Sequence, residues 1–184
     1  MTKSDMRAEE SAERPLVATL LISSSAQDYF NQLRQQHFPA DRNYLDAHLT
    51  LFHALPDQPW VIEDLSGLAK EHTPFNVKAE AVVSLGRGTA FKIVSPELSA
   101  IHQTLRKRWH DRLTAQDQQK RNFHITIQNK VEPHIAKKLQ SELTPSFEPF
   151  EFAVSGIHLW RYLGGPWEYV TTIYFDHFFT SPVM

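Results

Sequence analysis

His48-Leu49-Thr50-Leu51 and His124-Ile125-Thr126-Ile127 are two copies of one pattern, in which histidine and threonine alternate with apolar residues. Side chains two residues apart on a β-strand point to the same face. Each copy therefore predicts a strand with an imidazole and a hydroxyl on one face and apolar side chains on the other. Composition alone would give this pattern about 0.1 times in such a chain. Two copies thus indicate one site built from two similar halves.

The composition is that of an ordinary globular protein, with 41% hydrophobic and 22% charged residues in 184. We expect a single two-lobed domain over residues 15–184 and a disordered, polar tail over residues 1–14. No apolar run approaches the ~20 residues of a membrane helix, and the first residues lack the apolar segment of a signal peptide. These features predict a cytoplasmic protein without a membrane partner, and we expect it to be a monomer.

Cysteine usage and charge exclude several kinds of function. The chain has no cysteine, which removes disulfides, thiolate nucleophiles and zinc sites that use cysteine. It has 19 Lys and Arg against 21 Asp and Glu, a formal charge of −2. Duplex DNA is therefore not expected as a partner, because binding it requires many phosphate contacts from basic side chains. A small phosphorylated substrate remains compatible with this charge.

Hydrophobic periodicity predicts strands that alternate with helices. Prolines and glycines mark the turns, with Gly86-Arg87-Gly88 and Gly164-Gly165-Pro166 as hairpin turns. Strands are expected at residues 16–22, 47–54, 75–85, 89–94, 122–129, 150–160 and 168–175. Helices are expected at residues 26–36, 61–71 and 133–143, and a further helix is expected to open at residues 95–97, with Pro96 in its first turn, and to run to about residue 113. Each motif strand is followed by a helix and then a hairpin. This repeated order predicts an internal duplication that makes two lobes.

Two histidines and two threonines that meet between two lobes suit phosphodiester chemistry. One neutral imidazole can take a proton from water while the other, as imidazolium, gives a proton to the leaving oxygen. The hydroxyls can donate hydrogen bonds to the phosphoryl oxygens. An unperturbed pKa near 6.5 lets both forms of imidazole coexist at neutral pH, so neither a metal ion nor another cofactor is required. We assign His124 as the base and His48 as the acid, although pseudo-symmetry leaves the reverse assignment open.

The two copies of His-x-Thr-x, in a chain of this size, resemble the two-histidine (2H) phosphoesterase superfamily, in particular its bacterial 2′-5′ RNA ligase-like and cyclic phosphodiesterase members. The segments 47–52 and 124–130 carry the resemblance, which extends from about residue 16 to residue 175. It implies an α+β fold with two lobes and a pseudo-two-fold axis, in which two antiparallel sheets line a central groove and helices pack outside. It also implies hydrolysis of 2′,3′-cyclic or 2′-5′ phosphodiesters, with small nucleotides or RNA ends as substrates. The catalytic set it implies is His48, Thr50, His124 and Thr126.

Further residues are candidates for substrate binding. By strand alternation, Phe52 and Gln128 share the faces of the catalytic pairs and are expected to line the groove. Arg87 and Arg161 lie in or near hairpin turns, where a guanidinium could reach a phosphate. The last hairpin carries four aromatic residues that could stack on a base or fill the core, namely Trp160, Tyr162, Trp167 and Tyr169.

Other interpretations remain open at this stage. The motif histidines could be half-buried structural residues that bond to a neighbouring threonine. A zinc site would draw on His48, His53, His102, His110 or His134, but alternation places His53 on the face opposite to His48, and the chain has no His-Glu-x-x-His motif. The same site could also join RNA ends through a 2′-5′ bond, or bind nucleotides or RNA without catalysis.

Overall fold

The computed structural model describes residues 14–176, so the predicted N-terminal tail lies outside the described residues except for Arg14. The strands are β1 (Leu16–Ile22), β2 (Thr50–Leu55), β3 (Phe75–Ser84), β4 (Thr89–Val94), β5 (His124–Gln128), β6 (Phe150–Tyr162) and β7 (Trp167–Tyr174). The helices are α2 (Ser24–His37), α3 (Pro59–Lys70), α4 (Pro96–Arg108) and α5 (Pro133–Leu143), with short 3₁₀ turns at Ala40–Arg42, His110–Arg112 and Thr144–Ser146.

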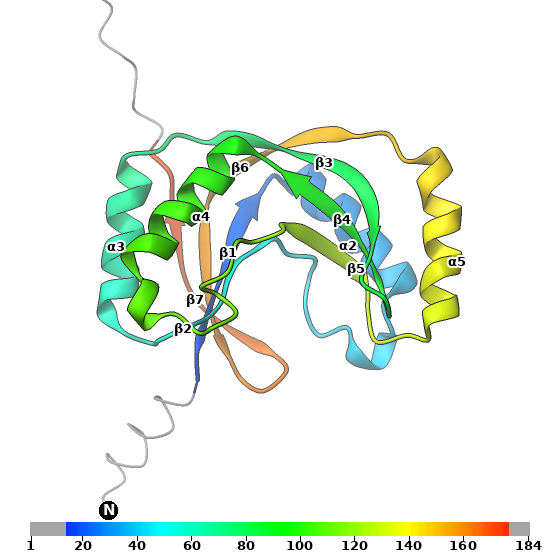
Figure 1. Ribbon diagram of the computed structural model, residues 1–184, viewed down its shortest axis with the longest axis horizontal. Coiled ribbons are helices and arrows are strands. Elements are labelled where there is room, and N and C mark those ends of the chain that lie inside the picture. Colours follow the sequence, from blue (N-terminus) through cyan, green and yellow to red (C-terminus); the bar gives the residue numbers. More distant parts are fainter. Residues whose placement is uncertain (1–13, 177–184) are drawn as a thin grey trace, which may run out of the picture.

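The strands form one curled antiparallel sheet in the order β2-β1-β6-β3-β4-β5 (Figure 1). Strand β6 belongs to both halves, because its first residues pair with β3 and its later residues pair with β1 on one edge and β7 on the other. The expected α+β class, with antiparallel strands and helices packed outside, is confirmed. The expectation of two separate sheets is wrong, since β6 joins the halves into a single sheet.

The curl of the sheet brings the two motif strands together. Leu49, just before β2, forms an isolated antiparallel bridge with Ile125 of β5. Both side chains are fully buried in the hydrophobic core. The two ends of the strand order thus meet at the second residue of each motif, and the halves face each other at that point.

The helices cover the outside of the curled sheet in two pairs. In Figure 1, α3 and α4 lie beside one half, and α2 and α5 lie beside the other. Helix α2 follows β1 but packs against the opposite half, where Phe30 contacts Phe91 of β4. None of the helices of residues 14–176 has the length and apolar character needed to cross a membrane.

Helix α4 begins and ends at identifiable contacts. The Ser95 hydroxyl accepts a hydrogen bond from the Leu98 backbone N–H at 3.1 Å, which is an N-cap. The helix ends at Arg108, earlier than the expected residue 113. Trp109 leaves the helical conformation, and its indole N–H donates to Asp64 of α3 at 2.7 Å. This contact fixes α4 against α3.

We predict opposite effects on stability from two glycine substitutions. A Cβ at Gly88 would lie 2.2 Å from the Gln128 carbonyl oxygen of β5, whereas a Cβ at Gly67 in α3 would meet no atom within 4 Å. Gly88→Ala should therefore lower the free energy of unfolding by about 1–3 kcal/mol through overpacking. Gly67→Ala should raise it by about 0.5–1 kcal/mol. Urea unfolding of both variants checks this, and equal stability of the two would contradict the close approach of β4 and β5.

Candidate active site

The four motif side chains gather on one face of the sheet, at the bridge between Leu49 and Ile125. Because the pair is antiparallel, residue 50 lies opposite residue 124 and residue 48 lies opposite residue 126. Residues next to the bridged pair project from the opposite face. His48, Thr50, His124 and Thr126 therefore share one face, while Leu49 and Ile125 fill the core behind it.

The two histidines have the same local geometry. Nδ1 of His48 lies 2.8 Å from the Asp46 carbonyl oxygen, and Nδ1 of His124 lies 2.9 Å from the Asn122 carbonyl oxygen. A carbonyl oxygen only accepts, so each Nδ1 carries the proton and donates to the residue two positions earlier. In the neutral imidazole, Nε2 is then the basic nitrogen. Both halves thus present the same nitrogen for proton transfer.

Helix α2 fastens the segment that leads to His48. The Gln27 side chain donates to the Ala47 carbonyl at 2.7 Å, and the Asn31 side chain accepts from the Ala47 N–H at 2.7 Å. One turn later, Arg34 donates to the Asn43 side chain at 2.8 Å. These three polar residues lie on one helix face, because they are four and three positions apart. The position of His48 therefore depends on α2 as well as on its own strand.

Burial and neighbouring positive charges keep both histidines neutral. Burial lowers the pKa of His48 to about 4, helped by the charges of Arg34, His124 and His53 and opposed by the Asp46 carbonyl. Burial also lowers the pKa of His124, helped by Arg121 and His53. The effect of His124 on the pKa of His48 agrees with the position of both imidazoles on one face. Near pH 7 both are neutral in the free protein.

An aromatic cavity of about 580 Å³ adjoins His48. The ring centroids of His48 and Trp167 lie 4.6 Å apart, and Trp160 lines the same cavity while its indole N–H donates to the Thr19 hydroxyl at 2.9 Å. His158 and Tyr44, which the sequence analysis did not single out, also line it. Of the four aromatic candidates in the last hairpin, Trp160 and Trp167 therefore reach this cavity, whereas Tyr162 and Tyr169 do not line it.

A second cavity, of about 970 Å³, adjoins His124 and is basic. Lys92, Lys120 and Arg121 line it together with apolar residues of β3 and β4. Lys92 pairs with Glu80 at 2.8 Å, whereas Lys120 and Arg121 make no ion pair with a carboxylate among the described residues. The site therefore has an aromatic side next to His48 and a cationic side next to His124.

Two β-bulges overturn the expectations for Phe52 and Gln128. Thr50 pairs with Thr19 and Phe52 with Ala18, so an extra residue lies between them on β2. Consecutive residues of β1 face opposite sides, and so must their partners Thr50 and Phe52. Phe52 is fully buried and packs on His102 and Trp109. The expectation that it lines the groove is wrong.

The same irregularity recurs in the second motif strand. Thr126 pairs with Ala90 and Gln128 with Thr89, which again leaves an extra residue between them. Gln128 consequently points away from Thr126, is buried, and accepts a hydrogen bond from the Thr89 hydroxyl at 3.2 Å. It is a structural residue and does not line the groove.

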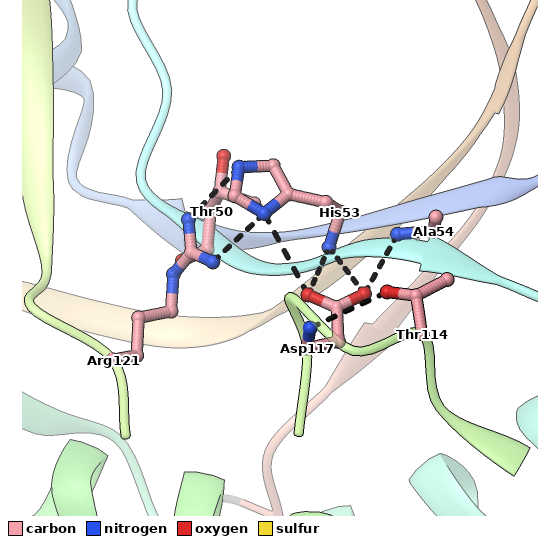
Figure 2. Close-up of polar contacts among 6 residues, drawn as sticks. All are labelled: Thr50, His53, Ala54, Thr114, Asp117 and Arg121. Atoms are coloured by element: carbon pink, nitrogen blue, oxygen red, sulfur yellow. Dashed lines mark hydrogen bonds and ion pairs between the residues drawn. The ribbon is translucent and has the colours of Figure 1, made fainter. Parts of the chain in front are cut away.

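The bulge on β2 between Thr50 and Phe52 also places His53 on the same face as His48. Simple alternation predicts the opposite face. The His53 ring lies between the Arg121 guanidinium, at 3.0 and 3.3 Å from its two nitrogens, and Asp117, at 3.6 Å (Figure 2). The buried Asp117 carboxylate accepts the backbone N–H groups of His53 and Ala54. Burial raises the pKa of Asp117, but its contact with the His53 side chain and these two backbone bonds together outweigh burial and hold that pKa below its usual value. Asp117 and Arg121 were not predicted from the sequence, since no motif marks either residue.

Arg87 and Arg161 do not reach either cavity. Exposed Arg87 donates to the Val131 carbonyl at 3.1 Å and pairs with Glu132 at 3.4 Å. Arg161 pairs with Asp57 at 2.9 Å and with Glu168 at 2.6 Å. Both guanidiniums are already engaged by carboxylates, and neither lines the cavities beside His48 or His124. The expectation that they bind phosphate therefore finds no support in their position.

The histidines considered for zinc form no metal-binding group among the described residues. Within residues 14–176, no group of three or more His, Asp or Glu side chains is placed to hold a metal ion. His102 stacks on Phe52 and contacts Phe123 edge-on in the core, where burial lowers its pKa to about 4. It acts as a packing residue.

The chain belongs to the 2′-5′ RNA ligase superfamily, whose family model matches residues 22–166. Among solved structures, TT0787 of Thermus thermophilus superposes with a TM-score of 0.62 at 15% identity, covering 88% of this chain and 97% of that one. Escherichia coli LigT, in its complex with 3′-AMP, superposes with a TM-score of 0.55 at 14% identity, covering 86% and 96%. No curated protein sequence matches the chain significantly. The fold is therefore that of the 2H phosphoesterases, as the sequence resemblance implied.

We predict that neither motif histidine titrates like an exposed imidazole, whose pKa is near 6.5. In a ¹H–¹³C NMR titration of the free protein, His48 should protonate near pH 4 and His124 below 6.5, because burial and positive neighbours disfavour the imidazolium. His48→Gln and His124→Gln variants assign the two signals. Titration of both residues at or above pH 6.5 would contradict the described electrostatics.

Proposed function

We propose that the protein is a phosphodiesterase that hydrolyses a 2′,3′-cyclic or 2′-5′ phosphodiester of a small nucleotide or an RNA end, without a metal ion. One observation carries this proposal. Two histidines, each oriented by a carbonyl at Nδ1, share a face with two threonines at the bridge between residues 49 and 125. This arrangement supplies two proton-transfer groups and two hydroxyl donors around one position, as hydrolysis of a phosphodiester requires.

The two histidines take different roles in the proposed reaction. The base accepts a proton from water as the water oxygen bonds to phosphorus, and the acid gives a proton to the ribose oxygen as its bond to phosphorus breaks. His48 has the strongly lowered pKa and stays neutral, which favours it as the base. His124 then becomes the acid once the anionic substrate has bound. This order is the reverse of the assignment from sequence.

The aromatic cavity beside His48 supports a nucleoside as part of the substrate. Trp167 and Trp160 provide indole faces on which a base can stack, and the cavity of about 580 Å³ is within the size range of small-molecule sites. LigT, which has the same fold, has been solved in complexes with 3′-AMP and with NADP+. We propose that the base occupies this cavity and the scissile phosphate lies between the four motif side chains.

Joining of RNA ends through a 2′-5′ bond is the second candidate, which the family's description favours. It uses the same two proton transfers on a 2′,3′-cyclic phosphate end, with the 5′-hydroxyl of a second RNA end in place of water: that hydroxyl gives its proton to the base as its oxygen bonds to phosphorus, and the acid protonates the 3′ ribose oxygen as its bond to phosphorus breaks. A module that only binds nucleotides has no need of two imidazoles with free Nε2 atoms. Incubation with an RNA that ends in a 2′,3′-cyclic phosphate and a second RNA with a free 5′-hydroxyl, followed by identification of the products, separates the three functions: hydrolysis opens the cyclic phosphate, ligation joins the two RNAs, and binding alone leaves both unchanged.

We predict that both motifs are needed for turnover of a 2′,3′-cyclic nucleotide. His48→Ala or His124→Ala should lower kcat/KM by about 10²-fold or more, because each removes a proton-transfer group. Thr50→Val or Thr126→Val should cost about 10- to 150-fold, since one hydrogen bond to a charged oxygen is worth ~1.5–3 kcal/mol. Thr→Ser variants, which keep the hydroxyl, are the matched controls. A histidine variant within about threefold of wild type would refute the paired mechanism.

Metal independence gives a separate prediction. Turnover should be unchanged after dialysis against excess EDTA, because the imidazoles perform both proton transfers. The pH profile of kcat/KM should be bell-shaped with its maximum below about pH 6.5, between the lowered pKa values of His48 and His124. Loss of activity with chelator and its recovery with zinc or magnesium would overturn this prediction.

A further inference from the structure

The main-chain carbonyl of each motif threonine accepts a hydrogen bond from an arginine in another part of the chain. The Thr50 carbonyl accepts from Nε of Arg121 at 2.8 Å, and the Thr126 carbonyl accepts from the Arg34 guanidinium at 3.0 Å. Arg121 precedes β5, and Arg34 lies on α2. The two arginines thus repeat one contact in the two halves of the site.

These two hydrogen bonds replace main-chain hydrogen bonds that a neighbouring strand would otherwise make. The motif strands share an isolated bridge at Leu49 and Ile125 instead of a continuous ladder. Away from a bridge, the carbonyls on that edge lose the partners a ladder would supply and need other donors. Arg121 and Arg34 supply these donors at Thr50 and Thr126. The separation that exposes the motif side chains is therefore stabilised by two guanidiniums.

The positions of these two charges, with Arg34 buried and Arg121 half-buried, are difficult to explain by structure alone. Arg34 is only 5% exposed, and the groups that its guanidinium contacts directly are neutral: the Asn43 amide, the Thr126 carbonyl and the ring of Phe38. Burial lowers its pKa to about 10, with Asp46 opposing. A buried charge without a directly bonded carboxylate is costly. A neutral donor such as glutamine could satisfy a carbonyl without that cost.

Arg121 shows the same imbalance in the other half. Burial lowers its pKa, and the carboxylate that opposes this effect, Asp117, forms an ion pair with the His53 ring and not with the guanidinium. Figure 2 shows the His53 ring in contact with both groups. An anion on the open side of the site would compensate both arginines.

We propose that Arg34 and Arg121 are a pair of positioning residues for the phosphodiester reaction. Each holds the main chain of the threonine in one motif where the strands separate, and each places a fixed positive charge near the histidine of the other motif, Arg34 near His48 and Arg121 near His124. An anionic phosphoryl group is therefore favoured between the motifs. His53 and Asp117 hold Arg121 in this position, as Asn43 and Phe38 hold Arg34. The inference rests on the proposed function for its catalytic consequence, but not for its electrostatic one.

The charged groups around each histidine define what the arginines do. His48 is influenced by Arg34 from α2, by His53 from β2 and by His124 from β5. His124 is influenced by Arg121 and His53, and its cross-strand partner on β4 is Lys92. All of these groups are cationic or become so on protonation. Removing Arg34 should therefore let His48 take a proton at higher pH, and removing Arg121 should do the same for His124.

The test separates charge from geometry with two substitutions at each arginine. Arg121→Gln should raise the pKa of His124, and Arg34→Gln that of His48, in NMR titrations that need no activity. Arg121→Lys and Arg34→Lys keep the charge but not the planar guanidinium, so the pKa values should stay near wild type. All four variants should lower kcat for a 2′,3′-cyclic nucleotide by up to about 10²-fold, because the reacting groups of the motifs are then misplaced. KM should change less than kcat.

Arg106→Gln is the matched control. Arg106 lines a smaller cavity together with Arg121, but it bonds to neither motif strand, and its charge acts on His102. Arg106→Gln should raise the pKa of His102 and leave both the pKa of His124 and kcat unchanged. If Arg106→Gln lowers kcat and raises the pKa of His124 as much as Arg121→Gln does, the effect is one of general charge, and the proposal is overturned.

The outcomes distinguish the two proposals. If the wild-type protein does not turn over the cyclic nucleotide, the proposed function fails, and the NMR titrations still decide the electrostatic role of the arginines. Suppose that wild type is active, that kcat of Arg121→Gln stays within about twofold of wild type, and that the pKa of His124 is unchanged in this variant. The proposed role of the arginine pair is then refuted. If Arg34→Gln does not fold, the lysine variant and the Arg121 pair carry the test.

Discussion

The isolated antiparallel bridge between Leu49 and Ile125 is the constraint on which the site depends. It brings together two segments that are far apart in the sequence, and its register sets which side chains meet: His48 faces Thr126, and Thr50 faces His124. The two bridged side chains are fully buried, so the apolar half of each motif anchors the core while the polar half forms the site. A longer ladder would bring the strands together and leave less room for a substrate between them.

Side chains complete the main-chain hydrogen bonds that this short contact leaves unmade. On β2, Arg121 donates to the Thr50 carbonyl while Asp117 accepts the N–H groups of His53 and Ala54. On β5, Arg34 donates to the Thr126 carbonyl. A backbone group left unpaired in a buried place would cost about 1–3 kcal/mol. The two arginines also place positive charge near the motif histidines, which helps to keep these histidines neutral.

The sequence was informative wherever alternation or helical periodicity was unbroken, and it failed at the bulges. Strand and helix positions and the pairing of His48 with Thr50 and of His124 with Thr126 follow from local patterns. Phe52, Gln128 and His53 lie beyond an extra residue on their strands, which reverses the face and leaves no mark in the hydrophobic pattern. Asp117 and Arg121 come from the segment between α4 and β5, where no periodicity indicates what a polar side chain will contact. The sharing of β6 between both halves is a long-range property that local patterns do not encode.

The central claim is that the two motifs form one anion site, and a crystal soaked with inorganic phosphate or sulfate tests it most directly. The account predicts one anion between the Thr50 and Thr126 hydroxyls, with Nε2 of both His48 and His124 within hydrogen-bond distance of its oxygens. An anion bound elsewhere, for example against Arg106 and Lys120, with the space between the motifs occupied only by water, would contradict it.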